Sequence, residues 1–250
     1  MKYYANTDIG KKRSVNQDTF FVHEYSDKIL LCAVLDGMGG HAGGETASFI
    51  AREVFLQIMS EALISKIESD GSVNLTRTQI FNIMQKAAQG ANTAVFEKAK
   101  RTPELSGMGT TLAAALIIGD ICYALNVGDS RIYEIKDAKI TQISRDHSYV
   151  QYLVDMGEIT PEEAKTNLNK SIITRAIGTQ ESVEGDTYVT SAEGATLLLC
   201  SDGLSGLVDD ETMLSIVGKS EELSDSVASL IHEANERGGS DNITAVLVRV

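Results

Sequence analysis

The chain has 250 residues, with 35 acidic and 22 basic side chains and a formal net charge of −13 at pH 7. A chain of this length can bury a sizeable core, and its 43% apolar residues and only 2 prolines exclude a disordered protein. Because nucleic-acid phosphates would be repelled by the acidic excess, we expect no nucleic-acid partner.

Three cysteines, Cys32, Cys122 and Cys200, lie in or at the end of apolar runs, and none has Cys-x-x-Cys spacing. This pattern indicates buried thiols in a reducing compartment, not a zinc site or a disulfide framework. The N-terminus lacks the apolar region of a signal peptide, and the best apolar run, 111–119, is too short to span a bilayer. We therefore expect a cytoplasmic monomer without a membrane partner.

The hydrophobic pattern predicts strands and long helices. In chain order, strands are expected over 2–7, 18–25, 29–35, 109–118, 121–127, 131–136, 183–190, 195–201 and 243–250. Helices are expected over 44–68, 77–101, 147–156, 209–217 and 221–237. The first two helices follow one another without a strand between them, which breaks a βαβ alternation. The chain therefore predicts an α+β fold, with antiparallel sheets and helices packed outside them.

The segment 144–182 is polar, lacks strand character and interrupts the series of strands. We interpret it as a flap inserted into a single catalytic domain that spans 1–250. Long segments outside the strands often carry specificity, so we expect the flap to influence substrate choice. Within it, His147 is a candidate for contact with the substrate.

Aspartates recur at the ends of predicted strands. They are Asp18, Asp36, Asp129, Asp202 and Asp241. Any one of them alone is typical of a turn. In antiparallel sheets, however, the end of one strand and the start of its neighbour share an edge, so these carboxylates could converge. Converging carboxylates repel one another unless a cation neutralises them, and oxygen ligands favour a hard cation such as Mg²⁺, Mn²⁺ or Ca²⁺.

A glycine-rich loop offers an alternative interpretation. Residues 37–42 match the G-x-G-x-x-A dinucleotide fingerprint, directly after a strand and before a helix. Asp36 would, however, place a negative charge beside the pyrophosphate, and no second strand with an acidic end follows, because 44–101 is predicted to be helical. Dinucleotide binding therefore stays open as the weaker alternative.

Six segments, taken in order, resemble the type 2C metal-dependent serine/threonine protein phosphatase family, and its compact bacterial members in particular. They are Gly10-x-x-Arg13-x-x-Asn16-Gln17-Asp18, Asp36-Gly37-Met38-Gly39-Gly40-His41, Gly109-Thr110-Thr111, Gly128-Asp129-Ser130-Arg131, Ser201-Asp202-Gly203 and Asp241-Asn242. The resemblance extends over nearly the whole chain. It implies an α-β-β-α sandwich, in which two antiparallel sheets are flanked by helices and a dinuclear metal centre lies at one edge.

The resemblance also implies the metal ligands. Asp36 would bridge two tightly bound Mn²⁺ or Mg²⁺ ions, with the Gly37 carbonyl on the second ion. Asp202 and Asp241 would bind the first ion. Asp129, together with Asp202, matches the position of a weaker third ion.

The catalytic residues implied in this way are Arg13, Asp18 and Asp36. Arg13 would bind the substrate phosphate, and Asp18 would hold a water on a metal ion. The implied reaction is the hydrolysis of phosphoserine and phosphothreonine in proteins by a metal-activated water, and the expected partners are phosphoproteins, including a serine/threonine kinase and its substrates. A small-molecule phosphoesterase and a non-catalytic metal- or partner-binding module on the same fold are the alternatives.

Three positions depart from the family pattern. Gln17 stands where many members have an acidic residue, so a metal ligand there is doubtful. Met38 replaces the histidine that many eukaryotic members carry as a proposed general acid, and 165–167 lacks a histidine that members often have. The proton donor for the leaving serine oxygen is therefore left unassigned.

Overall fold

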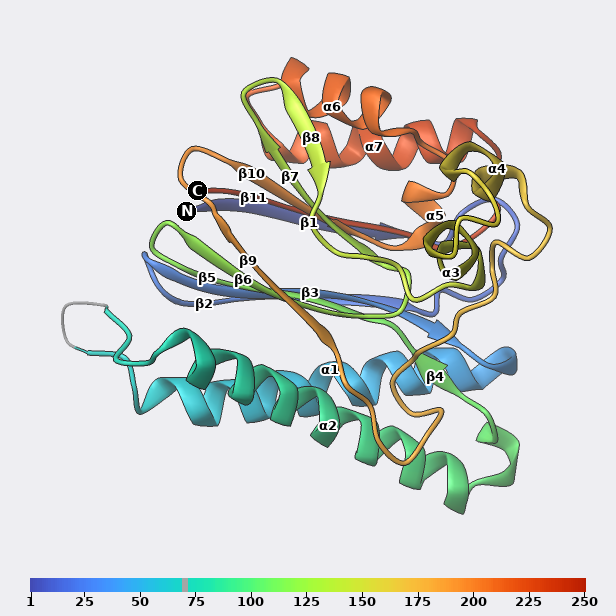
Figure 1. The fold of residues 1–250 in the computed structure, drawn as a ribbon, viewed down its shortest axis with the longest axis horizontal. Helices are drawn as coiled ribbons and strands as arrows, with labels where there is room; N and C mark the ends of the chain where they lie inside the picture. The colour runs from blue at the N-terminus through green and yellow to red at the C-terminus, as the bar shows by residue number, and fades with distance from the viewer. Residues whose placement is uncertain (69–71) are drawn as a thin grey trace.

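Two antiparallel sheets lie face to face between two layers of helices (Figure 1). The computed structural model describes residues 1–68 and 72–250. The first sheet has the strand order β1-β11-β10-β7-β8, and the second has the order β2-β3-β5-β6-β9, with β4 paired to β3. This arrangement confirms the predicted α+β sandwich.

The strands have the following bounds. They are β1 (Lys2–Asp8), β2 (Asp18–Ser26), β3 (Ile29–Met38), β4 (Gly109–Thr110), β5 (Leu112–Ile118), β6 (Ile121–Val127), β7 (Arg131–Lys136), β8 (Lys139–Gln142), β9 (Asp186–Ser191), β10 (Thr196–Cys200) and β11 (Ile243–Arg249). Every strand pair in the described ranges is antiparallel, which excludes the parallel sheet of a dinucleotide-binding fold. The two termini lie side by side, because β1 pairs with β11 (Figure 1).

Two long helices cover the second sheet and shorter ones cover the first (Figure 1). The helices are α1 (Gly40–Ile64), α2 (Arg77–Arg101), the 3₁₀ turn η1 (Pro103–Leu105), α3 (Tyr149–Asp155), α4 (Pro161–Thr166), α5 (Asp202–Ser205), α6 (Asp210–Lys219) and α7 (Leu223–Glu236). The beginning of α2 is fixed by Thr76, whose side chain forms a capping box with Gln79. No helix in the described part of the chain is both long and apolar enough to cross a bilayer.

The core is divided among three layers of side chains. One lies between α1, α2 and the second sheet, one between the two sheets, and one between the first sheet and α6 and α7. In strand β10, Leu197 and Leu199 face the other sheet, whereas Leu198 and Cys200 face the helices. Strand β10 is apolar at each of these positions because both of its faces are covered. A strand that is covered on both faces needs apolar residues at every position.

The structure differs from the predicted elements in several short regions: α4 and η1 were not predicted, and the strand expected over 109–118 is divided into β4 and β5. Helix α1 begins at Gly40, inside the glycine loop, instead of at residue 44. Strand β8 was not predicted, because it has four mostly polar residues and depends on a tight turn in which Asp137 and Ala138 both have positive φ. Helix α5 begins at Asp202, which the sequence places in a turn.

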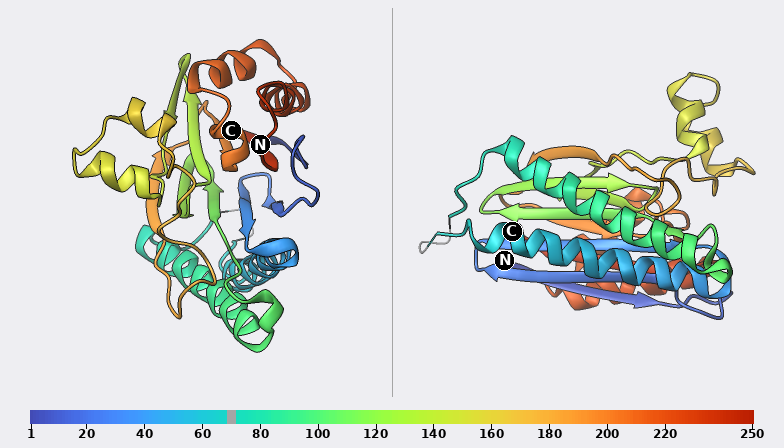
Figure 2. Two further views of the ribbon diagram at one scale, coloured as in Figure 1. Left: turned by 90° about the vertical axis from the view of Figure 1, so that its right-hand side faces the viewer. Right: turned by 90° about the horizontal axis from the view of Figure 1, so that it is seen from below.

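The segment 144–182 forms no strand and contains α3 and α4. It projects from one side of the sandwich (Figure 2). An isolated bridge between Thr110 and Ile177 links it to β4, and a second bridge, between Ser148 and Ile173, joins its two arms. We keep the name flap for residues 144–182.

Candidate metal and phosphate site

The predicted aspartates gather at one end of the two sheets. Asp18 opens β2 and lies opposite Asp36 in the register of β2 and β3. Asp202 follows β10 directly, and Asp241 comes just before β11, the neighbour of β10. Asp36 is close enough to Asp18, Asp202 and Asp129 for each of their charges to affect its pKa. The expected convergence at one edge therefore occurs.

Threonines hold the backbone at Asp36. The Asp36 amide donates to Thr111 Oγ1 at 2.9 Å, and the Asp36 carbonyl accepts from the Thr111 amide and from Thr110 Oγ1, each at 2.9 Å. The Thr111 hydroxyl also lies 2.7 Å from Ser130 Oγ, next to Asp129 in the chain. Thr111 thus connects the segments that carry two of the aspartates.

The loop after Asp36 is tightly packed against the start of α1. A side chain on Gly37 would collide with the Gly44 carbonyl. The Gly37 amide donates to the Gln17 carbonyl at 3.1 Å. Gln17 Nε2 in turn donates to the Gly40 carbonyl at 2.9 Å. Gln17, one of the departures from the family pattern, therefore holds the loop that presents the Gly37 carbonyl.

Asp18 is buried, and its two oxygens have different environments. Oδ2 accepts hydrogen bonds from Ser201 Oγ and Thr244 Oγ1, both at 2.7 Å. Oδ1 is buried and has no hydrogen-bond partner among the described residues. Burial raises the pKa of Asp18 to about 7, although the two hydroxyls lower it. The Oδ1 atom is thus the one oriented away from protein donors.

Burial also raises the pKa of three further carboxyls. The pKa values of Asp36 and Asp129 lie well above their usual range, and that of Asp202 is raised by burial and then by the charge of Asp241. Oδ1 of Asp129 and Oδ1 of Asp202 are buried without a partner in the described chain. Buried, unpaired carboxylate oxygens are costly unless a cation binds them, so this donor set fits a hard divalent cation.

Within residues 1–68 and 72–250, no group of three or more His, Cys, Asp or Glu side chains is already arranged to hold a metal ion. The Asp36 and Asp202 carboxyls are close enough for a shared proton to affect both pKa values, and Arg13 Nη2 binds Asp241 Oδ2 at 2.7 Å. A cation bound by Asp36 and Asp202 would displace the shared proton, and a cation bound by Asp241 Oδ2 would compete with Arg13. A hard divalent cation fits the all-oxygen donor set, because Oδ1 of Asp18, Asp129 and Asp202 has no partner in the described chain.

Arg13 lies at the exposed rim of this cluster. Half of its side chain is exposed. The hydrogen bond to Asp241 and the charges of Asp241, Asp36 and Asp202 raise the pKa of Arg13. Only Nη2 binds a described residue, so Nη1 and Nε remain available for a ligand. The loop that carries Arg13 is held by Asn242, whose Nδ2 donates to the carbonyls of Ile9 at 2.9 Å and Val15 at 3.0 Å.

Comparison with known proteins identifies the family. The profile described as Protein phosphatase 2C matches residues 9–247. The chain belongs to the protein phosphatase 2C family. It is 38% identical to the serine/threonine phosphatase stp of Listeria innocua, over 97% of this chain and 93% of that protein.

Solved structures of this family have the same fold. The serine/threonine phosphatase Stp1 from Staphylococcus aureus superposes with a TM-score of 0.87 at 31% identity, covering 100% of this chain and 94% of that one. The catalytic domain of the phosphatase PstP, solved in complex with two manganese ions, gives a TM-score of 0.80 at 36% identity, covering 98% of this chain and 96% of that one.

His147 lies apart from the exposed rim. Only 8% of its side chain is exposed, Nδ1 accepts from the Gly128 amide at 3.0 Å, and Nε2 lies 3.2 Å from Asp186 Oδ2. Both ring nitrogens thus have protein neighbours. The predicted substrate contact at this position would need one of these bonds to break.

The sequence assigned no role to the hydroxyl and amide groups that orient the aspartates. These are Thr111, Ser201, Asn242 and Thr244. Three of them are in the quoted family segments, and Ser201 and Asn242 stand directly beside an aspartate, which was the available signal. Their partners, however, come from distant parts of the chain.

Proposed function

We propose that this member of the protein phosphatase 2C family hydrolyses phosphoserine and phosphothreonine in proteins at the aspartate cluster. It is a metal-dependent serine/threonine protein phosphatase. The observation that carries the assignment of the site is the convergence of buried aspartates with unpaired oxygens beside the half-exposed Arg13. That combination provides a place for cations and, next to it, a place for a doubly charged phosphate.

The aspartates and one carbonyl would hold the metal ions. Two Mn²⁺ or Mg²⁺ ions would be bound by Asp36, the Gly37 carbonyl, Asp202 and Asp241, and a weaker third ion by Asp129 with Asp202. When bound, such ions lower the pKa of water and shield the charge of the phosphoryl oxygens. Asp18, with Oδ2 fixed by two hydroxyls and Oδ1 free, orients a water at the site.

Arg13 binds the phosphate. Nη1 and Nε are the guanidinium atoms without described partners, and a guanidinium can donate two parallel hydrogen bonds to phosphoryl oxygens. The contact of Nη2 with Asp241 shows that the guanidinium reaches the edge of the cluster. The substrate is thereby held where its phosphorus faces the aspartates.

The leaving oxygen needs a proton, and Met38 has no proton to give. We assign this step to a water molecule oriented by Asp129. Asp129 is buried and has an oxygen without a partner in the described chain, as such a role requires. Alkyl phosphates, whose leaving groups are poor, depend on this step more than aryl phosphates do.

The test is phosphate release from a phosphothreonine peptide, with small phosphoesters assayed in parallel. Activity should require Mn²⁺ or Mg²⁺, should disappear on exhaustive chelation, and should not be restored well by Zn²⁺, which prefers nitrogen and sulfur ligands. Turnover of small phosphoesters in preference to the peptide would indicate a small-molecule phosphoesterase. Metal binding without any turnover would indicate a non-catalytic module.

The substrates are phosphoproteins, and we propose that they include a serine/threonine kinase and its targets. We place the protein in the cytoplasm, because Cys32, Cys122 and Cys200 are all buried free thiols, which suit a reducing compartment. We also propose that it is a monomer.

A further inference from the structure

We propose that Asp146 and His147, neighbours at the base of the flap, are positioning residues that clamp the two ends of the turn carrying Asp129. The turn runs from Gly128 to Arg131 and joins β6 to β7. His147 holds its first residue and Asp146 holds its last. The inference rests on the proposed role of Asp129 and extends it to residues that do not touch the substrate.

At the first end, Gly128 is bound through both of its peptide groups. Its amide donates to His147 Nδ1 at 3.0 Å, and its carbonyl accepts from the His147 amide at 2.9 Å and from Asn126 Nδ2 at 3.0 Å. Gly128 has φ 106°, a conformation that favours glycine, and a Cβ there would be 2.7 Å from Thr111 Cβ. The peptide that precedes Asp129 is thus fixed on several sides.

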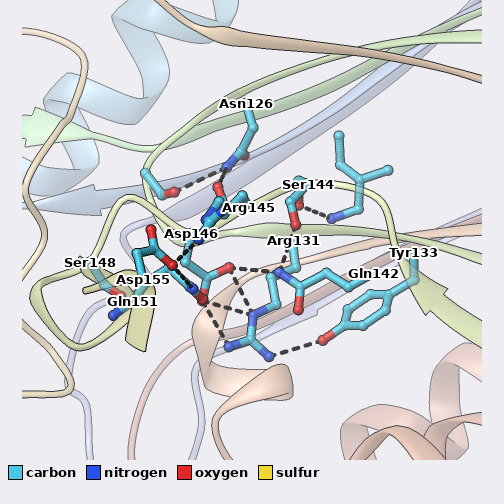
Figure 3. Close-up of polar contacts among 12 residues, drawn as sticks. Asn126, Arg131, Tyr133, Gln142, Ser144, Arg145, Asp146, Ser148, Gln151 and Asp155 are labelled. Atoms are coloured by element: carbon cyan, nitrogen blue, oxygen red, sulfur yellow. Dashed lines mark hydrogen bonds and ion pairs between the residues drawn. The ribbon is translucent and has the colours of Figure 1, made fainter. Parts of the chain in front are cut away.

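At the other end, Arg131 forms a two-pronged ion pair with Asp146 (Figure 3). Arg131 Nε and Nη2 lie 3.0 and 2.8 Å from Asp146 Oδ2, and Nη1 donates to the Tyr133 hydroxyl at 3.0 Å. Gln142 Nε2 adds a bond of 2.8 Å to Asp146 Oδ1. Only 9% of the Asp146 side chain is exposed, so solvent competes little with this pair.

The hydrogen bonds define the state of the His147 ring. Because Nδ1 accepts a hydrogen bond from the Gly128 amide, the neutral ring carries its proton on Nε2, and this N–H donates a hydrogen bond to Asp186 Oδ2 at 3.2 Å. Arg175 Nη1 is 3.0 Å from Nε2 but is itself a donor, and it binds Asp186 Oδ1 at 2.7 Å. Burial lowers the pKa of His147, which agrees with a neutral ring.

This arrangement ties the flap to the catalytic turn. The His147 carbonyl also accepts from the Thr174 amide at 2.8 Å. His147 therefore connects the segment that leads into α3 with the segment that follows α4. Asn126 Nδ2 adds a bond of 3.1 Å to the Arg145 carbonyl (Figure 3). A displacement of the flap base therefore pulls on the peptide next to Asp129.

Two amide substitutions separate this role from substrate contact. In His147→Asn, the side-chain oxygen takes the place of Nδ1 and still accepts from the Gly128 amide. In His147→Gln, the amide lies near Nε2 instead, and the Gly128 bond is lost. The clamp predicts that His147→Asn retains most of the turnover, whereas His147→Gln loses about tenfold in kcat on phosphothreonine peptide with little change in KM. Aryl phosphate turnover should fall less in His147→Gln.

Three measurements accompany the kinetics. Exchange of the Gly128 amide with solvent should accelerate in His147→Gln but not in His147→Asn. Mn²⁺ titration by calorimetry should show the tight sites unchanged in both variants. In the wild-type protein, ¹⁵N shifts should show Nδ1 of His147 unprotonated. As a second variant, Asp146→Asn loosens the other end of the turn. The loss of turnover in this variant should likewise be larger for alkyl than for aryl phosphates.

The outcomes are distinct. A rise in KM for the peptide in both His147 variants, with kcat and Gly128 exchange unchanged, would overturn the clamp and restore a substrate contact. The reference variant is Asp129→Ala, in which the hydrolysis of alkyl phosphates should be strongly slowed. If Asp129→Ala leaves alkyl turnover intact, the proposed role of Asp129 fails and the clamp loses its function, while the assignment as a phosphatase stands on the metal-dependent assay.

Discussion

A single oxygen of Asp18 receives two hydroxyl hydrogen bonds, and the hydroxyl of Thr244 is linked in turn to Thr7. Thr7 Oγ1 lies 2.7 Å from Thr244 Oγ1 and accepts from Asn16 Nδ2 at 2.9 Å. Because Thr244 donates to Asp18, Thr7 must donate to Thr244, and the chain of hydrogen bonds has one direction. At the residue scale, this chain of hydrogen bonds and the hydroxyl of Ser201 together set the orientation of the buried Asp18 carboxylate.

We expect Thr244→Val to weaken the site, since it removes a donor from Asp18 Oδ2 without changing the shape of the side chain. Losing one of the two hydrogen bonds to this carboxylate costs about 1.5–3 kcal/mol of folding stability. Thermal unfolding and Mn²⁺ titration at pH 8 would measure the loss. Thr244→Ser, which keeps the hydroxyl, is the matched control and should restore most of the metal affinity. Equal metal affinity in Thr244→Val and wild type would refute the orienting role.

Arg13 should act on the substrate rather than on the metal ions. We expect Arg13→Ala to reduce kcat/KM by about tenfold or more, because a hydrogen bond to a charged group contributes about 1.5–3 kcal/mol. Calorimetry should show Mn²⁺ binding at least as tight as in wild type, since Asp241 Oδ2 loses a competing partner. Arg13→Lys keeps the charge but not the fork, so it should recover only part of the loss. Unaltered kcat/KM in Arg13→Ala would leave Arg13 as a surface residue.

At the scale of elements, the junction of β3 with α1 depends on the approach of two backbones. A Cβ on Gly44 would lie 2.6 Å from the Gly37 carbonyl oxygen and 2.7 Å from Gln17 Cδ. Contacts of this kind force the backbone apart. The start of α1 therefore sets the position of the Gly37 carbonyl, one of the proposed metal ligands.

Gly44→Ala tests this junction. Replacing glycine by alanine inside a helix normally stabilises it by about 1 kcal/mol, but overpacking here should cost about 1–3 kcal/mol and should also weaken Mn²⁺ binding. Gly218→Ala in α6 is the control, because a Cβ at that position meets open space. Chemical denaturation should show Gly218→Ala at or above wild-type stability. A stabilised Gly44→Ala with full metal affinity would contradict the close packing.

For the whole molecule, the buried aspartates link stability to pH when metal is removed. Their pKa values are raised in the folded state, that of Asp18 from 3.8 to about 7. A group of this kind stabilises the fold fully below its unfolded pKa, near 4, and the contribution is lost as pH rises through the folded value. The metal-free protein should therefore unfold at a lower temperature at pH 8 than at pH 5.

Added Mn²⁺ should reverse the loss of stability at pH 8. At a free Mn²⁺ concentration of a hundred times its Kd, binding raises the free energy of unfolding by about 2.7 kcal/mol. Asp18→Asn should flatten the dependence on pH in the metal-free protein, which separates this effect from the general repulsion of a chain with net charge −13. Differential scanning calorimetry across pH 5–8, with and without chelator, gives both results. A metal-free protein that is equally stable across this range would contradict the raised pKa values.

The sequence alone determined the elements whose pattern is local. Helix α2 has the predicted bounds 77–101, because its apolar period and its Thr76 cap lie within a few residues of one another. Strands β3 and β10 were predicted from continuous apolar runs, and the aspartates at their ends were placed together by the rule that antiparallel neighbours share an edge. Resemblance then supplied the roles expected of these residues.

Only the tertiary structure decided how the aspartates are oriented and what His147 touches. Asp18 takes its hydroxyl donors from Ser201 and Thr244, 183 and 226 residues away, and no periodicity in the sequence marks such pairs. The contact of His147 with Gly128 likewise depends on how the flap base folds back on the turn between β6 and β7. Local propensity fixes which residues form strands and helices, whereas the partners of a buried polar group depend on which distant segments the packing brings beside it.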